Sequence, residues 1–188
     1  LKRLFPICRS LTGSGNRETL RILQEVVPLK IVEYPSGTKV FDWIIPEEWN
    51  VRDAWIKNAN GSKLVDFKKS NLHLVSYSQP MNKSMPFTEL KEHLHFDKNR
   101  QIIPYRTSYY KKNWGFCVNK SQFTELSESQ GDLEVFIDSA FNPKGSLTVG
   151  ELIIPGEIEE EILISTYFCH PSLANANLSG VVMTAFSS

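Results

Sequence analysis

Hydrophobic positions recur at helical spacing near the start of the chain and follow strand-like patterns after it. Leu20, Leu23 and Val27 lie between a polar break at residues 13–16 and Pro28, which predicts a helix that ends before this proline. β-Branched and aromatic residues dominate the segments that follow, and they favour short strands. We expect these strands at residues 29–34, 40–45, 51–57, 63–67, 71–77, 114–118, 133–138 and 147–154, with one short helix after Pro86.

The C-terminal segment has a different pattern. Residues 162–167 read Ile-Leu-Ile-Ser-Thr-Tyr, a largely apolar run that is typical of a strand buried on both faces of a helix-covered, largely parallel sheet. An asparagine-rich loop follows, and a helix is expected to begin at Asn177 or Leu178. The two ends of the chain therefore predict one α/β domain, built from residues 1–40 and 145–188. A β-rich domain, residues 41–144, is predicted to be inserted between them.

Composition narrows the classes of function. The 188 residues carry 21 Lys and Arg against 21 Asp and Glu, so the net charge is zero and no cationic face for a nucleic-acid partner is expected. The longest apolar run has only a few residues, so no membrane partner is expected either. Three cysteines at wide spacing fit neither a disulfide framework nor a zinc ribbon. This pattern favours a reducing compartment, and we expect a cytoplasmic protein.

The ends of the sequence suggest a piece of a longer polypeptide. The chain begins at Leu1 rather than at a methionine, and Ser188 falls about eleven residues into the last expected helix. We therefore expect a fragment. The sequence leaves the oligomeric state open.

One polar loop, residues 165–180, carries the most informative chemistry. Open α/β sheets place their sites where such a loop leaves the carboxyl end of a buried strand. His170 is expected at that point, and its imidazole is either a metal ligand or a proton carrier. The alternative is a structural histidine whose hydrogen bonds are satisfied locally, and residue type and position alone favour this alternative.

Several motifs extend over nearly the whole chain in a recognisable order. They are Arg-Ser-Leu-Thr-Gly at 9–13, Pro-Ser-Gly-Thr-Lys-Val-Phe-Asp-Trp at 35–43, Thr-Ser-Tyr-Tyr at 107–110, Trp-Gly-Phe-Cys at 114–117, Gly-Glu-Leu-Ile-Ile-Pro-Gly at 150–156 and the loop at 165–180. Together they resemble bacterial aminopeptidase-like proteins that are often linked to polysaccharide biosynthesis and are relatives of the co-catalytic di-zinc aminopeptidases. The resemblance implies a zinc-aminopeptidase-like, helix-covered mixed sheet with an inserted β-rich domain.

The resemblance also assigns roles within the loop. The family motif is His-Pro-Ser-Leu-Ala-Asn-Asp-Asn-Leu-Ser-Gly, which implies that His170 is a zinc ligand and that the aspartate bridges two metal ions. Ala176 stands at the aspartate position here, and its side chain has no donor atom. Asn175 and Asn177 offer only neutral amide oxygens, which replace an anionic bridge poorly. Zinc is therefore expected for the full-length family but not as a tightly bound ion of this chain, and no catalytic or other cofactor-binding residue is assigned.

Two functional hypotheses follow. In the first, the chain is the N-terminal portion of a zinc metallo-aminopeptidase-like hydrolase that acts on a small peptide or an amide-bearing substrate, and the chain by itself is inactive. In the second, it is a non-catalytic binding or scaffolding module linked to polysaccharide biosynthesis, in which the β-rich domain recognises the partner. Ala176 motivates the second hypothesis.

Other residues with metal-binding chemistry have simpler explanations. His93 and His95 form a His-x-His pair without a third ligand nearby in the sequence, so a solvated helix end is expected. Cys117 and Cys169 lie in apolar surroundings, and we expect buried, inert thiols.

Overall fold

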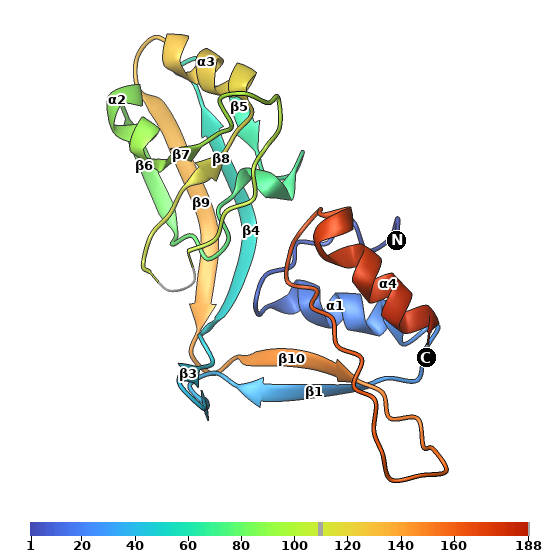
Figure 1. Cartoon of the computed structure of the whole chain (residues 1–188). Helices are drawn as coiled ribbons and strands as arrows, with labels where there is room; N and C mark the ends of the chain where they lie inside the picture. Colours follow the sequence, from blue (N-terminus) through green and yellow to red (C-terminus); the bar gives the residue numbers. More distant parts are fainter. Residues whose placement is uncertain (109–110, 188) are drawn as a thin grey trace. The chain divides into compact units, whose positions relative to one another are not determined.

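The computed structural model describes residues 1–108 and 111–187 (Figure 1). Helices and strands are mixed along the chain, so the fold is of the mixed α/β class. The chain divides into two compact units, Leu1–Trp49 with Phe141–Ser188 and Asn50–Ala140. The sequence placed the domain boundaries at 40/41 and 144/145, and the insertion of one domain into another stays a prediction. Within the described residues, no helix combines the length and the apolar character that crossing a membrane requires.

The first unit combines two α-helices with two two-stranded antiparallel sheets among its described residues. Helix α1 (Ser14–Leu23) begins after Gly13, whose φ of 118° is a conformation that glycine adopts readily. Strand β1 (Lys30–Pro35) pairs antiparallel with β10 (Ser146–Glu151), and Lys30 lies opposite Glu151. The remaining elements are β2 (Lys39–Val40), β3 (Trp43–Ile44), the π-helical turn η3 (Ala174–Leu178) and helix α4 (Ser179–Phe186).

The core of the first unit joins its N- and C-terminal segments. Leu20 and Leu23 of α1 belong to the same buried hydrophobic cluster as Leu178 and Val181, which lie in η3 and α4. Helix α1 also approaches β10 closely, because a Cβ added at Gly150 would lie 2.7 Å from Leu20 Cδ2. Glycine at this position therefore permits the contact between the helix and the strand.

The second unit is built on a four-stranded sheet in the order β5-β4-β9-β6. Ala54, Ile56, Val65, Val135 and Ile137 point to one face and are buried, as expected for a sheet with one covered face. The strands of this sheet are β4 (Glu48–Lys57), β5 (Lys63–Asp66), β6 (Met81–Met85) and β9 (Leu133–Asn142). The other elements are η1 (Asn71–His73), α2 (Phe87–Leu90), η2 (Lys91–His93), α3 (Lys120–Glu128) and the parallel pair β7 (Leu94–His95) and β8 (Phe116–Cys117).

The prediction of a buried strand at residues 162–167 is wrong for this structure. The segment has no strand assignment and follows β10 as an irregular loop (Figure 1), with Ile162 92% and Leu163 89% exposed. A strand forms only where a neighbouring backbone supplies hydrogen bonds, and β1 pairs with β10 instead. The expectation of a largely parallel sheet is wrong as well, since both described two-stranded sheets of this unit, β1-β10 and β2-β3, are antiparallel. His170 therefore does not lie at the end of a strand.

Three further strand predictions are corrected. Residues 71–77 begin with the 3₁₀ turn η1 instead of a strand, and His73 at its end is buried. Residues 40–45 form parts of the two short strands β2 and β3, because the chain turns at Phe41, whose φ is 55°. The strand expected at 114–118 is reduced to the two residues of β8.

Candidate functional site

The loop at residues 165–180 folds back on itself and brings His170 against Asn177. The five-residue turn η3 places Asn177 so that its Nδ2 lies 3.0 Å from His170 Nδ1. The ring of Tyr167 meets the imidazole edge to face, with 5.4 Å between the ring centroids. Asn177 is only 4% exposed, whereas His170 is half-buried. The structure thus brings together His170 and Asn177, which the sequence singled out, and places the side-chain amide of Asn177 at hydrogen-bond distance from the imidazole.

A buried arginine anchors this loop to the N-terminal segment. The guanidinium of Arg9 is fully buried and donates hydrogen bonds from Nη1 to the Leu4 carbonyl and from Nη2 to the His170 carbonyl, the latter at 3.0 Å. These acceptors are backbone oxygens, and burial lowers the pKa of Arg9 to about 10. A guanidinium can satisfy several acceptors at once with its planar fork of donors, which suits this cross-link. Sequence reasoning missed this role, because no local pattern marks an arginine for burial.

The electrostatic environment favours neutral groups in the loop. Burial, and secondarily the positive charge of Arg9, lowers the pKa of His170 from its ordinary value. Burial raises the pKa of the Cys169 thiol, and it raises that of Cys8 to about 12. Both thiols are therefore protonated near neutral pH and are poor nucleophiles and poor metal ligands in this state.

The donor set of this chain does not fit a zinc site by itself. Ala176 contributes no donor atom, and the Nδ1 of His170 already faces the amide of Asn177. Within residues 1–108 and 111–187, no three His, Cys, Asp or Glu side chains gather closely enough to hold a metal ion. A zinc site requires three or four such ligands. The Oδ1 of Asn177 is buried without a hydrogen-bond partner, but it is a neutral acceptor.

Ring stacking, a polar contact and burial account for the positions of the other candidate residues. The imidazole of His93 stacks on the ring of Trp114, with 3.8 Å between centroids, and its Nδ1 lies 3.1 Å from the Trp114 carbonyl oxygen. His95 is half-buried. Cys117 is fully buried, and desolvation raises its pKa to about 12. Of the motifs quoted above, Tyr109 and Tyr110 lie outside the described residues.

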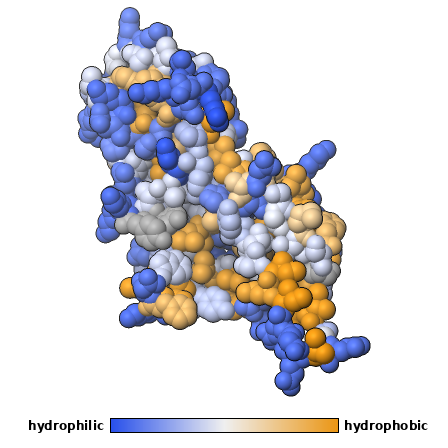
Figure 2. Space-filling model, viewed as in Figure 1, coloured by the Kyte–Doolittle hydropathy of each residue, from blue (hydrophilic) through white to orange (hydrophobic). Residues whose placement is uncertain are grey.

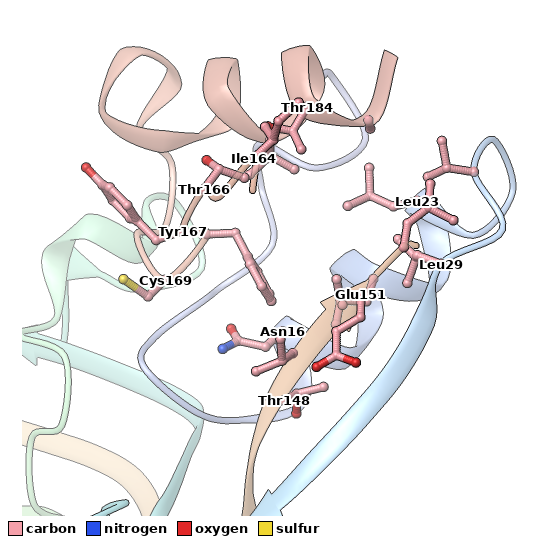
Figure 3. A pocket seen from close by; sticks show the side chains of 18 of the residues that line it. Asn16, Leu23, Leu29, Thr148, Glu151, Ile164, Thr166, Tyr167, Cys169 and Thr184 are labelled. Atoms are coloured by element: carbon pink, nitrogen blue, oxygen red, sulfur yellow. The ribbon is translucent and has the colours of Figure 1, made fainter. Parts of the chain in front are cut away.

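An apolar groove of about 470 Å³ lies beside the loop within the first unit (Figure 3). Its walls come from α1, β10, residues 162–169 and α4. The one fully buried amide among its lining residues belongs to Asn16, which is 2% exposed. Its Nδ2 donates to the carbonyls of Ser10 and Leu11, and its Oδ1 is buried without a partner. Figure 3 shows this side chain between Thr148 of β10 and the segment that carries Tyr167 and Cys169.

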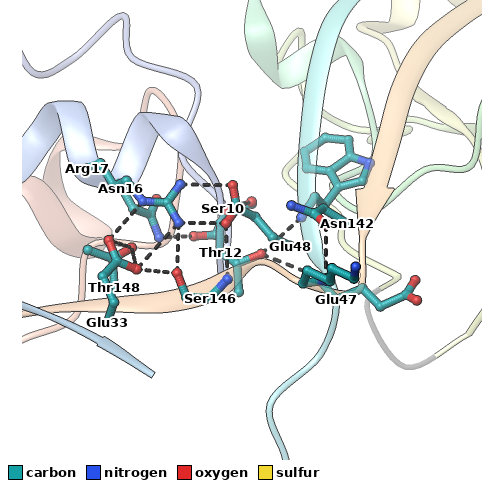
Figure 4. A network of polar contacts seen from close by, with 12 residues as sticks. Ser10, Thr12, Asn16, Arg17, Glu33, Glu47, Glu48, Asn142, Ser146 and Thr148 are labelled. Carbon is teal, nitrogen blue, oxygen red and sulfur yellow. Dashed lines mark hydrogen bonds and ion pairs between the residues drawn. The ribbon is translucent and has the colours of Figure 1, made fainter. Parts of the chain in front are cut away.

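A polar cluster beside α1 joins elements of this unit (Figure 4). Arg17 Nη2 lies 2.6 Å from Glu48 Oε2, and its Nε lies 2.8 Å from Glu33 Oε1. The hydrogen bond to Glu48 is the main reason that the pKa of Arg17 is raised. Although burial acts in the opposite direction, hydrogen bonds from Arg17, Ser146 and Thr148 lower the pKa of Glu33. The cluster links α1 with β1, β4 and β10, and its chemistry is that of a structural ion-pair network.

Comparison with known proteins places this chain among aminopeptidase-like relatives. A Clostridium acetobutylicum protein, provisionally named a polysaccharide biosynthesis protein with an aminopeptidase-like domain, is 54% identical over 187 residues. The match covers 99% of this chain but only 42% of that protein. A 2.37 Å crystal structure of a C. acetobutylicum protein, provisionally called a peptidase, superposes with a TM-score of 0.94 at 53% identity. It covers 99% of this chain, which in turn spans 44% of the solved chain.

The family assignment follows from a match along the whole sequence. A family model described as a domain of unknown function, DUF4910, matches residues 1–188, that is, both compact units and the loop that carries His170. The motifs that resemble aminopeptidase-like proteins lie within this match. The chain belongs to the DUF4910 family.

Proposed function

We propose that this chain is the N-terminal portion of a zinc aminopeptidase-like hydrolase with the corresponding fold, and that it does not hydrolyse peptides by itself. The observation that carries the proposal is the composition of the loop. His170 is paired with the amide of Asn177, and position 176 between two asparagines is an alanine. The names of the relatives, which refer to an aminopeptidase-like domain and to a peptidase, support the class of the reaction.

The missing carboxylate explains why hydrolysis is not expected from this chain. In co-catalytic zinc enzymes a carboxylate between two metal ions neutralises their charge and keeps them close together. An amide oxygen carries no net charge, so Asn175 and Asn177 are weak replacements. The substrate proposed for the whole protein is a small peptide or an amide-bearing compound, linked to polysaccharide biosynthesis by the name of the curated relative.

The second candidate function is a binding or scaffolding module. The specific observation in its favour is that Asn177 Nδ2 lies at hydrogen-bond distance from His170 Nδ1, while Arg9 holds the His170 carbonyl to the N-terminal segment. This arrangement gives the imidazole a hydrogen-bond partner that is not a metal ion. A module of this kind retains the fold of an enzyme and recognises a related ligand without turnover.

A zinc titration distinguishes the two candidates. We expect the unsubstituted chain to bind zinc weakly in a calorimeter and to show no turnover of an aminoacyl-anilide. Ala176→Asp should raise zinc affinity at least tenfold, because it adds an anionic oxygen in the loop that carries His170. Ala174→Asp is the matched control, since Ala174 and Ala176 are both exposed in η3 and the added charge is the same.

The zinc titration has outcomes that distinguish the hydrolase from the binding module. An equal gain in zinc affinity for Ala176→Asp and Ala174→Asp indicates a nonspecific charge effect and favours the binding module. Tight zinc binding or turnover by the unsubstituted chain contradicts the proposal, because it requires a site built from residues other than those of the loop.

A further inference from the structure

The short hairpin that follows β1 carries apolar side chains at its end. Val40 of β2 lies opposite Trp43 of β3, and the turn between them consists of Phe41 and Asp42. Phe41 is 93% exposed, and its neighbours Val40 and Ile44 are 38% and 61% exposed. Figure 1 shows the hairpin at the end of the β1–β10 sheet, and Figure 2 shows hydrophobic side chains on this part of the surface. We call Val40, Phe41 and Ile44 the hairpin tip.

The backbone of this turn is unfavourable for the residue that occupies it. Phe41 has a φ of 55°, whereas Asp42 does not have a positive φ. A two-residue hairpin turn with a positive φ at its first position only has the pattern of type II′, which favours glycine at that position. A bulky side chain is crowded by its own backbone in this region. Glycine fills the comparable positions Gly37 and Gly61, whose φ angles are 85° and 79°.

The side chain of Phe41 does not compensate for this backbone conformation within the part of the chain that the structure describes. An exposed fraction of 93% leaves its ring almost without contacts. Burial of apolar surface therefore cannot offset the strained backbone at this position. A strained residue that stabilises nothing around it indicates a function, and an exposed aromatic ring has the chemistry of an anchor in an interface.

The shape of the hairpin tip indicates the form of its binding partner. Residues directly opposite each other in an antiparallel pair share a face, so Val40 lies on the face of Trp43 and Ile44 lies on the face of Lys39. Val40 and Ile44 are therefore on opposite faces, and Phe41 lies at the end between them. A flat surface would cover only one of the two faces. The complementary shape is a recess that encloses the tip.

The small area of the tip favours an interface within one polypeptide. A buried phenylalanine contributes roughly 150–250 Å². Because Val40 and Ile44 are only partly exposed, the tip cannot supply the roughly 800 Å² per partner that a stable complex of separate proteins buries. Two parts of one polypeptide need a smaller interface, since their linkage raises the effective concentration of each for the other.

The relatives have such a second part. This chain spans 42% of the curated C. acetobutylicum relative and 44% of the solved chain. More than half of the length of each of these proteins therefore lies outside the match. The solved chain superposes on 99% of this chain with a TM-score of 0.94, so the fold described above occurs there together with the additional part in one polypeptide.

We propose that the hairpin tip docks into an apolar recess on the part of the polypeptide that the longer relatives carry outside the match. Phe41 is the anchor and fills the depth of the recess, while Val40 and Ile44 contact its two walls. The unfavourable backbone at Phe41 is then offset by burial of the ring. This proposal goes beyond the proposed function and does not depend on zinc binding.

Hydrogen exchange tests whether the tip is covered. The 188-residue chain is compared with a chimera in which this chain replaces the matching 42% of the C. acetobutylicum relative. Exchange is followed in peptides that span residues 39–44, and we expect it to be at least tenfold slower in the chimera. Unchanged exchange in the chimera overturns the proposal. Protection that grows with the concentration of the short chain also overturns it, because a second copy is then the partner.

Substitutions at position 41 test the anchor by stability. In the short chain, Phe41→Gly should lower the melting temperature by no more than about 1 °C, because glycine adopts a positive φ readily and the lost ring is exposed. In the chimera the same change should lower it by about 3 °C or more, because a buried aromatic ring is then lost. Equal effects in the two proteins contradict docking of Phe41.

Phe41→Leu is the matched control, since it keeps an apolar side chain at the same backbone position. In the chimera it should lower the melting temperature less than Phe41→Gly does, because part of the buried apolar surface remains. A loss for Phe41→Leu as large as that for Phe41→Gly contradicts an apolar anchor at this position.

Discussion

Arg9 and His170 are joined across 161 residues by one hydrogen bond, from the guanidinium Nη2 to the carbonyl oxygen, at 3.0 Å. The same guanidinium donates to the carbonyl of Leu4, so a single buried side chain fixes the loop that carries His170 to the N-terminal segment. The position of the imidazole thus depends on a residue that lies far from it in the sequence.

Arg9→Met should therefore destabilise the protein. It removes the side-chain donor that the Leu4 and His170 carbonyl oxygens share, although the Leu4 oxygen also accepts from the Ile7 N–H. Loss of a buried hydrogen-bond donor costs about 1–3 kcal/mol, so we expect a loss of about this size. Urea unfolding followed by circular dichroism measures the loss. Arg21→Met is the control, because Arg21 is an exposed arginine of α1 and its replacement should change stability by less than about 0.5 kcal/mol. Equal stabilities of the two variants contradict the anchoring role of Arg9.

A negative charge at position 177 should change the pKa of His170. Asn177→Asp replaces the amide at 3.0 Å from Nδ1 by a carboxylate, which favours the imidazolium and should raise the pKa of His170 by about one unit or more. The pKa is followed by the NMR titration of the ring protons. Asn175→Asp adds the same charge at an exposed position of the same turn and should have a smaller effect. A larger shift for Asn175→Asp is incompatible with the observed pairing.

The buried carboxylate of Glu48 should contribute to the stability of the first unit. Glu48→Gln removes one partner of Arg17 and weakens the acceptor for the Ser146 N–H, which lies 3.1 Å from Oε2. Since Arg17 is partly exposed and keeps Glu33, we expect a loss of about 1–3 kcal/mol, less than for a fully buried pair. Glu47→Gln alters an exposed neighbour and should leave the free energy of unfolding unchanged in the same urea titration. If the Glu48→Gln variant is as stable as the unsubstituted chain, the cluster does not stabilise the fold.

His73 should make stability depend on pH. Burial lowers the pKa of His73 in the folded protein, although the Cys117 carbonyl at 2.8 Å from Nδ1 partly opposes this. The unfolded chain then binds more protons than the folded one below about pH 6.5, so stability falls as the pH decreases, with a slope of up to about 1.4 kcal/mol per pH unit. The effect is absent above the unfolded pKa. In urea titrations between pH 5 and 8, His73→Gln should show a shallower decrease than the unsubstituted chain, and an identical decrease rules out this origin.

Local patterns predicted the elements that depend on local interactions. The helix that contains Leu20 and Leu23 and the strands that became β1, β4 and β10 follow their hydrophobic periodicity. Helix α3 was missed, although its capping box, in which Asn119 and Gln122 exchange hydrogen bonds, is a recognisable start signal. Strand β6 was missed because only Met81 and Met85 are apolar in it, and its pairing with β9 determines its conformation.

Long-range partners determined what the sequence could not predict. The apolar run at 162–167 has strand propensity, but whether it forms a strand depends on a neighbouring backbone. His170 and Ala176 were singled out from the motif, whereas the pairing of His170 with Asn177 depends on the π-helical turn η3. The buried amide of Asn16 and the anchoring by Arg9 arise from tertiary contacts and leave no signal in the local pattern.

The central claim is tested most directly by a chimera in which this chain replaces the matching 42% of the C. acetobutylicum relative. Its hydrolysis of an aminoacyl-anilide is measured with and without Ala176→Asp. The account predicts no measurable turnover with alanine at position 176, and zinc-dependent turnover at least a hundredfold above background once the carboxylate is present, since the bridging group is then restored. Ala174→Asp in the same chimera should remain inactive. Turnover by the unsubstituted chimera that equals the turnover of the Ala176→Asp chimera would contradict the account, because position 176 would then have no part in the reaction.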